Sequence, residues 1–404
     1  MTQLSHSNVW CAICGGPVAS YNITSHYNRP KDCYKYDPDL VDPTDVEWTN
    51  QSQILGYNPS AAANSKFYVS GPARIRRFLS LSSEAQQDPN LGGIDVRSLI
   101  VYKNEKCRER VIPFHPECYE TLAWYLTGTP DTTKINKGAL YRTFDRFSVV
   151  RKIRPLELRC LSLDYGDVNE AQGWYWKCIP GREYTVSNPQ YRTELQNEIS
   201  SFISGSEFKS EAPQFCYGAR TGSNPLAALP ETVIYAISEF LDNPSLLNLF
   251  CASWATFLSL RDSDSFWRKR IVTQLPYFTE LHECLRNQSK SLESRDFRKI
   301  FLWAETASQP RAGVAKSMFP VANRRRIWMV CEQIESLYIR EPRRQPTEQS
   351  YIRHQAVKSK LQVLGDTESQ ACTLGQRISC EAGMNSYSHG QLTSSGTRKE
   401  NCPA

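Results

Sequence analysis

Two features that define whole classes of protein are missing from this sequence: a long apolar run and a charged leader. Its 404 residues contain no run of about 18 successive apolar residues, the length that a membrane-spanning helix needs. The opening stretch, MTQLSHSNVWCAICGG, has no basic segment followed by an apolar run of about 7–15 residues, so we expect no secretory signal. These absences predict a soluble protein of the cytoplasm, the nucleus or both.

Motifs of the common catalytic classes are also missing. The sequence has no Walker loop, no GxSxG elbow, no GxGxxG and no HExxH, and we therefore expect a protein without catalytic residues. No repeat of about 20–50 residues is visible, which argues against propellers and solenoids. The net charge of +6 is too small to indicate nucleic-acid binding by itself.

Cysteine, in contrast, is plentiful. A long chain with 14 cysteines and no secretory signal favours reduced thiols, some of them bound to metal. Cys11 and Cys14 form a CxxC followed by two glycines, the pattern of a zinc knuckle that supplies half of a tetrahedral site. His115 and Cys118, at the start of an expected helix, have the spacing to supply the other half. The sequence thus predicts a structural zinc site held by Cys11, Cys14, His115 and Cys118.

Other interpretations of these cysteines stay open. The four residues could be unrelated core side chains, and Cys33 or Cys107 could replace one of the ligands. A redox role for the CxxC is less favoured, because Gly-Gly-Pro follows it where a helix would be expected.

Patterning predicts mixed structure in the first half of the chain. Residues 1–150 are expected to form an α+β region, with a helix in FHPECYETLAWYLTG that ends at Gly128. Residues 151–222 are expected to hold a β-hairpin in WYWKCIPGREYTV, turning at Pro180-Gly181, then a helix over 189–203 and a linker.

The second half is expected to be helical up to its tail. Residues 273–340 carry apolar side chains at helical spacing, and one of these helices includes the basic run Arg324 to Arg326. An acidic partner or a solvated face is the favoured role for these arginines. Residues 341–404 are poor in large apolar side chains and are expected to be disordered. The overall expectation is an α+β fold that is mainly α.

Between these halves, residues 223–272 predict three short amphipathic helices. Leu229-Pro230 is suited to open the first helix, and Asn243-Pro244 to cap and open the second. The third element ends at Phe266-Trp267. So few residues cannot fill a core of their own, and their apolar faces must pack either on the rest of the chain or on another protein.

The order Leu-Pro, apolar helix, proline-containing break, apolar helix and Phe-Trp resembles an F-box. Thr232 departs from the pattern, since an acidic residue is usual there. The flanking motifs WCAICGGP, FHPECYE and NRRRIW resemble those of a fungal family of F-box proteins over residues 9–340.

This resemblance implies a substrate-recognition subunit of a cullin-based (SCF) ubiquitin ligase, which binds the ligase's small adaptor subunit through the box and presents an unknown protein target. Two alternatives remain: a zinc-stabilised interaction module outside any ligase, and a nucleic-acid-binding regulator that uses the basic helix. The residues expected to contact the adaptor are apolar: Leu229, Pro230, Val233, Ile234, Ile237, Phe240, Leu241, Leu246, Leu249 and Trp267.

Overall fold

The computed structural model describes residues 9–20, 23, 35–59, 61–75, 80–83, 99–100, 110–153, 156–173, 175–210, 226, 229–287 and 295–341. All of them belong to one compact unit, Met1–Pro342. Cys33, Cys107 and the predicted disordered tail beyond Glu341 lie outside the described residues.

The β structure is antiparallel and short. Strand β1 (Gln53–Tyr57) pairs with β2 (Phe67–Val69) on one side and with β6 (Ile112–Phe114) on the other. A second sheet contains β3 (Ala73–Ile75), β4 (Ser80–Ser83) and β5 (Leu99–Ile100), and β7 (Ser148–Ile153) forms a hairpin with β8 (Leu156–Leu161).

The β-hairpin predicted around Pro180-Gly181 is wrong. The chain does turn there, with Gly181 at φ +84°, but a short 3-10 helix, η5 (Glu183–Val186), follows in place of a strand. The side chain of Trp176 is fully buried against Trp10, with ring centroids 5.7 Å apart. The bulky residues of this segment therefore fill a core and do not alternate across a sheet.

Helices of the first half begin and end largely where local signals predict. Helix α2 (Pro116–Thr127) begins at a proline and ends at Gly128, which adopts the left-handed conformation at φ +73°. Helix α3 (Lys137–Phe147) is capped by the Asn136 side chain, which accepts a hydrogen bond from the Ala139 amide. The remaining elements are η1 (Pro43–Asn50), η4 (Thr132–Lys134), α4 (Val168–Ala171), α5 (Thr193–Ile203) and η6 (Ser206–Phe208).

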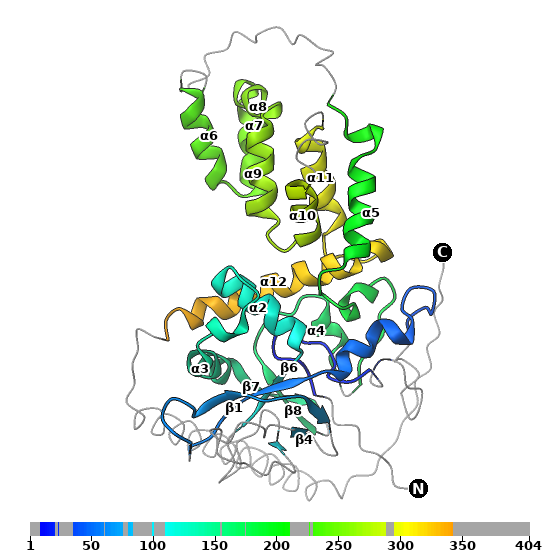
Figure 1. Ribbon diagram of the computed structural model, residues 1–404, viewed down its shortest axis with the longest axis vertical. Coiled ribbons are helices and arrows are strands. Elements are labelled where there is room, and N and C mark those ends of the chain that lie inside the picture. The colour runs from blue at the N-terminus through cyan, green and yellow to red at the C-terminus, as the bar shows by residue number, and fades with distance from the viewer. Residues whose placement is uncertain are drawn as a thin grey trace, which may run out of the picture. The chain divides into compact units, whose positions relative to one another are not determined.

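Residues 223–272 are hereafter the box segment, and their described part from 229 onward contains or begins four α-helices and not three. These are α6 (Glu231–Phe240), α7 (Asn243–Ala252), α8 (Trp254–Arg261) and α9 (Asp264–Gln274) (Figure 1). The predicted second helix is divided because the Ser253 side chain caps a new one by accepting from the Thr256 amide. The cap of α7 is Asp242, one residue before the predicted Asn243.

The box segment shares its core with its flanks. Helices α10 (Thr279–Asn287) and α11 (Phe297–Ala307) follow it, and Ile234, Leu246 and Trp267 join one apolar cluster with side chains from α5, α9, α10 and α11. After η8 (Lys316–Met318), the long helix α12 (Phe319–Tyr338) packs against α2, α3 and η5 (Figure 1). The mainly helical α+β class is thus confirmed, and none of the described helices is both long and apolar enough to cross a membrane.

Candidate metal centre and exposed helix face

The first half of the candidate metal centre is a tight turn over WCAICGGP. The Cys11 amide donates to the Gly16 carbonyl at 2.8 Å, and the Gly15 amide donates to the Cys11 carbonyl at 2.8 Å. Two further amides point at sulfur: that of Cys14 lies 3.5 Å from the Cys11 Sγ, and that of Gly16 lies 3.2 Å from the Cys14 Sγ. The turn therefore directs both thiols and two N–H donors toward one place, as a thiolate metal ligand requires.

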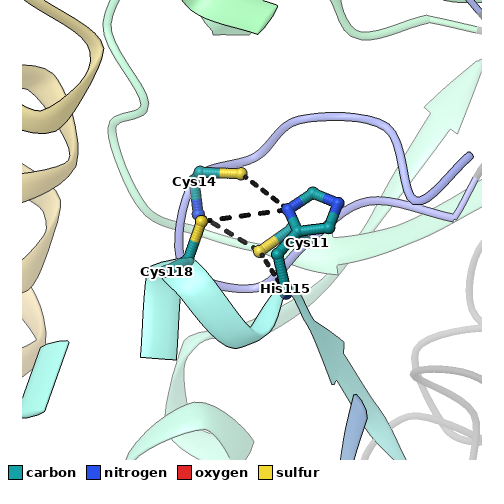
Figure 2. Close-up of side chains that lie close together, drawn as sticks. All are labelled: Cys11, Cys14, His115 and Cys118. Atoms are coloured by element: carbon teal, nitrogen blue, oxygen red, sulfur yellow. Dashed lines mark hydrogen bonds between the residues drawn. The ribbon is translucent and has the colours of Figure 1, made fainter. Parts of the chain in front are cut away.

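The second half comes from the end of β6 and the first turn of α2. His115 is the last residue before α2, and Cys118 lies in its first turn (Figure 2). The His115 Nδ1 is 3.4 Å from the Cys14 Sγ and 3.8 Å from the Cys118 Sγ. All four ligand atoms lie within 4.8 Å of one another, and all four residues are buried. The structure thus brings together the four predicted ligands in a cluster that can hold a metal ion.

A hydrogen bond at the second ring nitrogen of His115, Nε2, fixes the orientation of the ring. The His115 Nε2 lies 3.1 Å from the carbonyl oxygen of Pro17, which can only accept a hydrogen bond. Nε2 is therefore a donor, and Nδ1 is the ring nitrogen that faces the sulfurs of Cys14 and Cys118. This is the usual second-shell arrangement of a metal-bound histidine.

Burial and close contacts shift the pKa values of Cys11, His115 and Cys118. Burial alone would raise the pKa of the Cys11 thiol, but hydrogen bonds with Cys118 and Cys14 and the charge of His115 lower it well below its usual value. Burial would lower the pKa of His115, but the neighbouring Cys11 and Cys14 thiolates raise it well above its usual value. Burial and hydrogen bonds with Cys11 and Cys14 raise the pKa of the Cys118 thiol well above its usual value, so the negative sulfur favoured beside the His115 charge is that of Cys11.

Three segments distant in sequence support the turn through its carbonyl groups. The Tyr165 hydroxyl donates to the Ala12 carbonyl at 2.9 Å, and the Gln172 side chain donates to the Gly15 carbonyl at 2.7 Å. The Arg326 guanidinium donates to the Cys14 carbonyl at 2.7 Å and is itself held by the Asn323 side chain. The turn over WCAICGGP is therefore in contact with the NRRRIW segment of α12. The sequence alone does not predict this contact.

The other arginines of NRRRIW also have partners inside the protein. Arg324 forms a bidentate ion pair with Glu280 of α10, and Arg325 pairs with Glu305 of α11. Arg324 and Arg326 are almost fully buried. The basic helix that the nucleic-acid alternative depends on is therefore not a basic surface, whereas the expected acidic partner is present for Arg324 and Arg325.

The ten residues expected to contact an adaptor divide by exposure. Val233, Ile237 and Phe240 of α6 are 40%, 42% and 90% exposed, and Pro230 is also exposed. Leu229, Leu241 and Leu249 are partly buried against the shared core. Ile234, Leu246 and Trp267 are buried within that core, so in this structure they support the helices and have no surface to offer a partner.

Comparison with known proteins adds no relative to this picture. No protein-family model, no curated protein and no solved structure matches the chain.

Proposed function

We propose that this protein is a non-catalytic substrate receptor that docks on the small adaptor subunit of a cullin-based ubiquitin ligase. One observation carries the proposal. Val233, Ile237 and Phe240 form an apolar stripe on α6, hereafter the α6 face, and this stripe follows the Leu-Pro start of the F-box-like pattern.

The spacing of the α6 face supports a helix-mediated contact. Residues at i, i+4 and i+7 lie on one side of a helix, and here the buried side, with Ile234, is a different one. Leu247 of α7 and Trp254 of α8 add further exposed apolar surface in the same segment. Large apolar side chains gathered in one short segment are characteristic of protein interaction sites.

Structural zinc belongs to the same proposal. Three sulfurs and one imidazole nitrogen are a ligand set that zinc prefers, and with four protein ligands no coordination position remains for a reacting water. Tetrahedral zinc would place its ligand atoms about 3.5–4 Å apart, close to the 3.4 Å and 3.8 Å that separate His115 Nδ1 from two of the sulfurs. Zinc would tie the N-terminal turn to α2 and leave the adaptor surface untouched.

Binding to the recombinant adaptor subunit tests the proposal. The double substitution Val233→Asp and Ile237→Asp should reduce affinity at least about a hundredfold, because two carboxylates would enter an apolar interface. Both side chains are exposed in the free protein, so its thermal unfolding should barely change. Isothermal titration calorimetry with the purified full chain measures the first effect, and calorimetric unfolding measures the second.

The matched control is Leu302→Asp on α11, which places the same charge at a leucine that is 54% exposed and outside the box segment. This variant should bind the adaptor as the wild type does. Failure of the wild-type protein to bind, or equal binding by the double variant, contradicts the proposal.

A further inference from the structure

A cavity of about 360 Å³ lies away from both the metal centre and the α6 face. It is enclosed by the loop that leads into η1, by η5, by the first turns of α5 and by the start of α12. Its size falls in the range of about 300–1,000 Å³ that ligand pockets occupy. Four segments of the chain thus form a recess that is separate from the candidate metal centre and from the α6 face.

The floor of this recess is apolar and rigid. Val186, Leu195 and Phe319 line it and are themselves buried in the protein. Phe319 belongs to a cluster with Tyr184 and Ala322, against which Leu40 packs. Such a floor suits a hydrocarbon chain.

The charged groups around the floor are mostly acidic. Four carboxylates (Asp45, Glu183, Glu194 and Glu198) line the recess against two cations, Arg192 and Lys316, which leaves a net charge of −2. The Lys316 ammonium already donates to the Asp39 carbonyl at 2.7 Å. None of the four carboxylates forms an ion pair with any residue in the described part of the chain.

Glu183 is the decisive group, because it is only 4% exposed and yet carries a carboxylate that lines the recess. Its Oε1 accepts a hydrogen bond from the Gly181 amide at 2.8 Å, whereas Oε2 has no partner among the described residues. The Trp48 indole donates to the Val186 carbonyl at 2.9 Å and so fixes the short helix that carries Glu183. Oε2 is not among the fully buried atoms that lack a partner, so it is accessible from the recess, where a cation can pair with it.

We propose that this recess binds the arginine side chain of a protein substrate. An arginine combines a hydrocarbon stem, which fits the apolar floor, with a planar cation that can donate to the free oxygen of Glu183. Charge-assisted hydrogen bonds of this kind are stronger than neutral ones. The identity of the ligand as a substrate segment rests on the proposed receptor function, but binding at the recess does not involve the adaptor.

Calorimetric titration of the full-length protein with short peptides tests the inference. Acetyl-Ala-Arg-Ala-amide should bind, and the matched citrulline peptide should bind at least about tenfold more weakly, because it keeps the shape of arginine and loses the charge. Glu183→Gln should weaken arginine-peptide binding to the same extent. Its amide oxygen can still accept from the Gly181 amide, so the local fold should persist.

Two further variants complete the test. Glu194→Lys with Glu198→Lys reverses the charge of two exposed rim residues and should abolish binding without disturbing the core. Glu332→Gln removes an exposed carboxylate outside the recess and should leave binding unchanged. Absence of binding by the wild type, equal binding of the citrulline peptide, or tighter binding of free L-arginine would overturn the inference. Adaptor binding through α6 would be unaffected by any of these results.

Discussion

Gly15 is a residue whose identity the candidate metal centre requires. Its φ of +71° is a conformation that side-chain-bearing residues rarely adopt. A Cβ atom at this position would also lie 2.7 Å from the Tyr165 ring, which packs directly over the turn. The same glycine allows the turn to close so that the Gly16 amide reaches the Cys14 sulfur. Glycine at this position thus leaves room for the candidate ligands and for the Tyr165 ring that packs on the turn.

Cys14→Ser tests the metal centre at this scale. The substitution removes one sulfur ligand, and we expect bound zinc to fall from about one ion per chain to near zero. Because zinc binding is coupled to folding, the N-terminal region should lose several kcal/mol of stability. Elemental analysis of the purified protein and calorimetric unfolding provide the two measurements, while adaptor binding should be retained.

Cys251→Ser is the matched control, since this free cysteine is exposed on α7 and far from the cluster in sequence. Its zinc content should equal that of the wild type. Well-folded wild-type protein that contains no metal would exclude the zinc site.

Helix α12 holds the protein together through buried arginines. Arg324 donates from Nη1 to Glu280 Oε2 at 2.8 Å and from Nη2 to Glu280 Oε1 at 2.9 Å, so α12 and α10 are joined by a bidentate ion pair. The same helix also contacts the candidate metal centre, because Arg326 donates a hydrogen bond to the Cys14 carbonyl. The helix therefore couples the region beside the box segment to the N-terminal region.

The ion pair predicts a pH dependence of stability. Burial alone would raise the pKa of Glu280, but the charge and hydrogen bonds of Arg324 lower it below its usual value. A carboxyl with a lowered folded-state pKa stabilises the fold above its unfolded pKa of about 4.3, and this contribution is lost as pH falls through the folded pKa. The free energy of unfolding should therefore decrease from pH 6 toward pH 3.

Glu280→Gln isolates this contribution. At pH 7 the variant should be destabilised by about 3–5 kcal/mol, because Arg324 keeps its buried charge without an anionic partner. Its deficit relative to the wild type should shrink as pH falls below the carboxyl range. Urea unfolding of both proteins between pH 7 and pH 3 measures this, and parallel stability curves would contradict the assignment.

At the scale of the whole molecule, the box segment is both part of the core and a free surface. Leu246 and Leu247 are neighbours on α7, yet Leu246 is 3% exposed and belongs to the shared core, whereas Leu247 is 62% exposed. The same cluster includes Leu195 of α5 and Ile300 of α11, which lie outside the box segment on either side. The box segment cannot therefore be removed without exposing the apolar surface of its flanks.

This arrangement predicts opposite behaviour for two adjacent leucines. Leu246→Ala should destabilise the protein by about 2–5 kcal/mol through lost burial and a cavity, and should do so for the flanking helices as well. Leu247→Ala should change the free energy of unfolding by no more than about 0.5 kcal/mol. Urea unfolding followed by far-UV circular dichroism compares them, and equal effects would contradict the shared core.

Local signals in the sequence predicted most elements that depend on nearby residues. Gly128 ends α2 as predicted, and the CxxC and HPEC spacings named the four members of the candidate metal centre, because caps, turns and ligand pairs act over a few positions. The same reasoning misjudged WYWKCIPGREYTV, where Trp176 packs against Trp10 in the core and η5 stands in place of a strand. Alternation of bulky and small residues cannot distinguish a buried strand from a loop packed in the core, since both structures bury the same side chains.

By itself, then, the sequence indicated that the second half of the protein is helical and which residues can bind a metal. It also indicated that the box segment has more apolar surface than it can bury alone. Only the tertiary structure decided which part of that surface is left over. Ile234 and Leu246 are covered by the flanking helices, while Val233 and Ile237 remain exposed. The tertiary structure also brings Arg326 to the turn of the candidate metal centre and places Glu183 in the lining of the recess. These outcomes depend on contacts between distant segments, and helical spacing specifies a face of a helix without specifying what covers it.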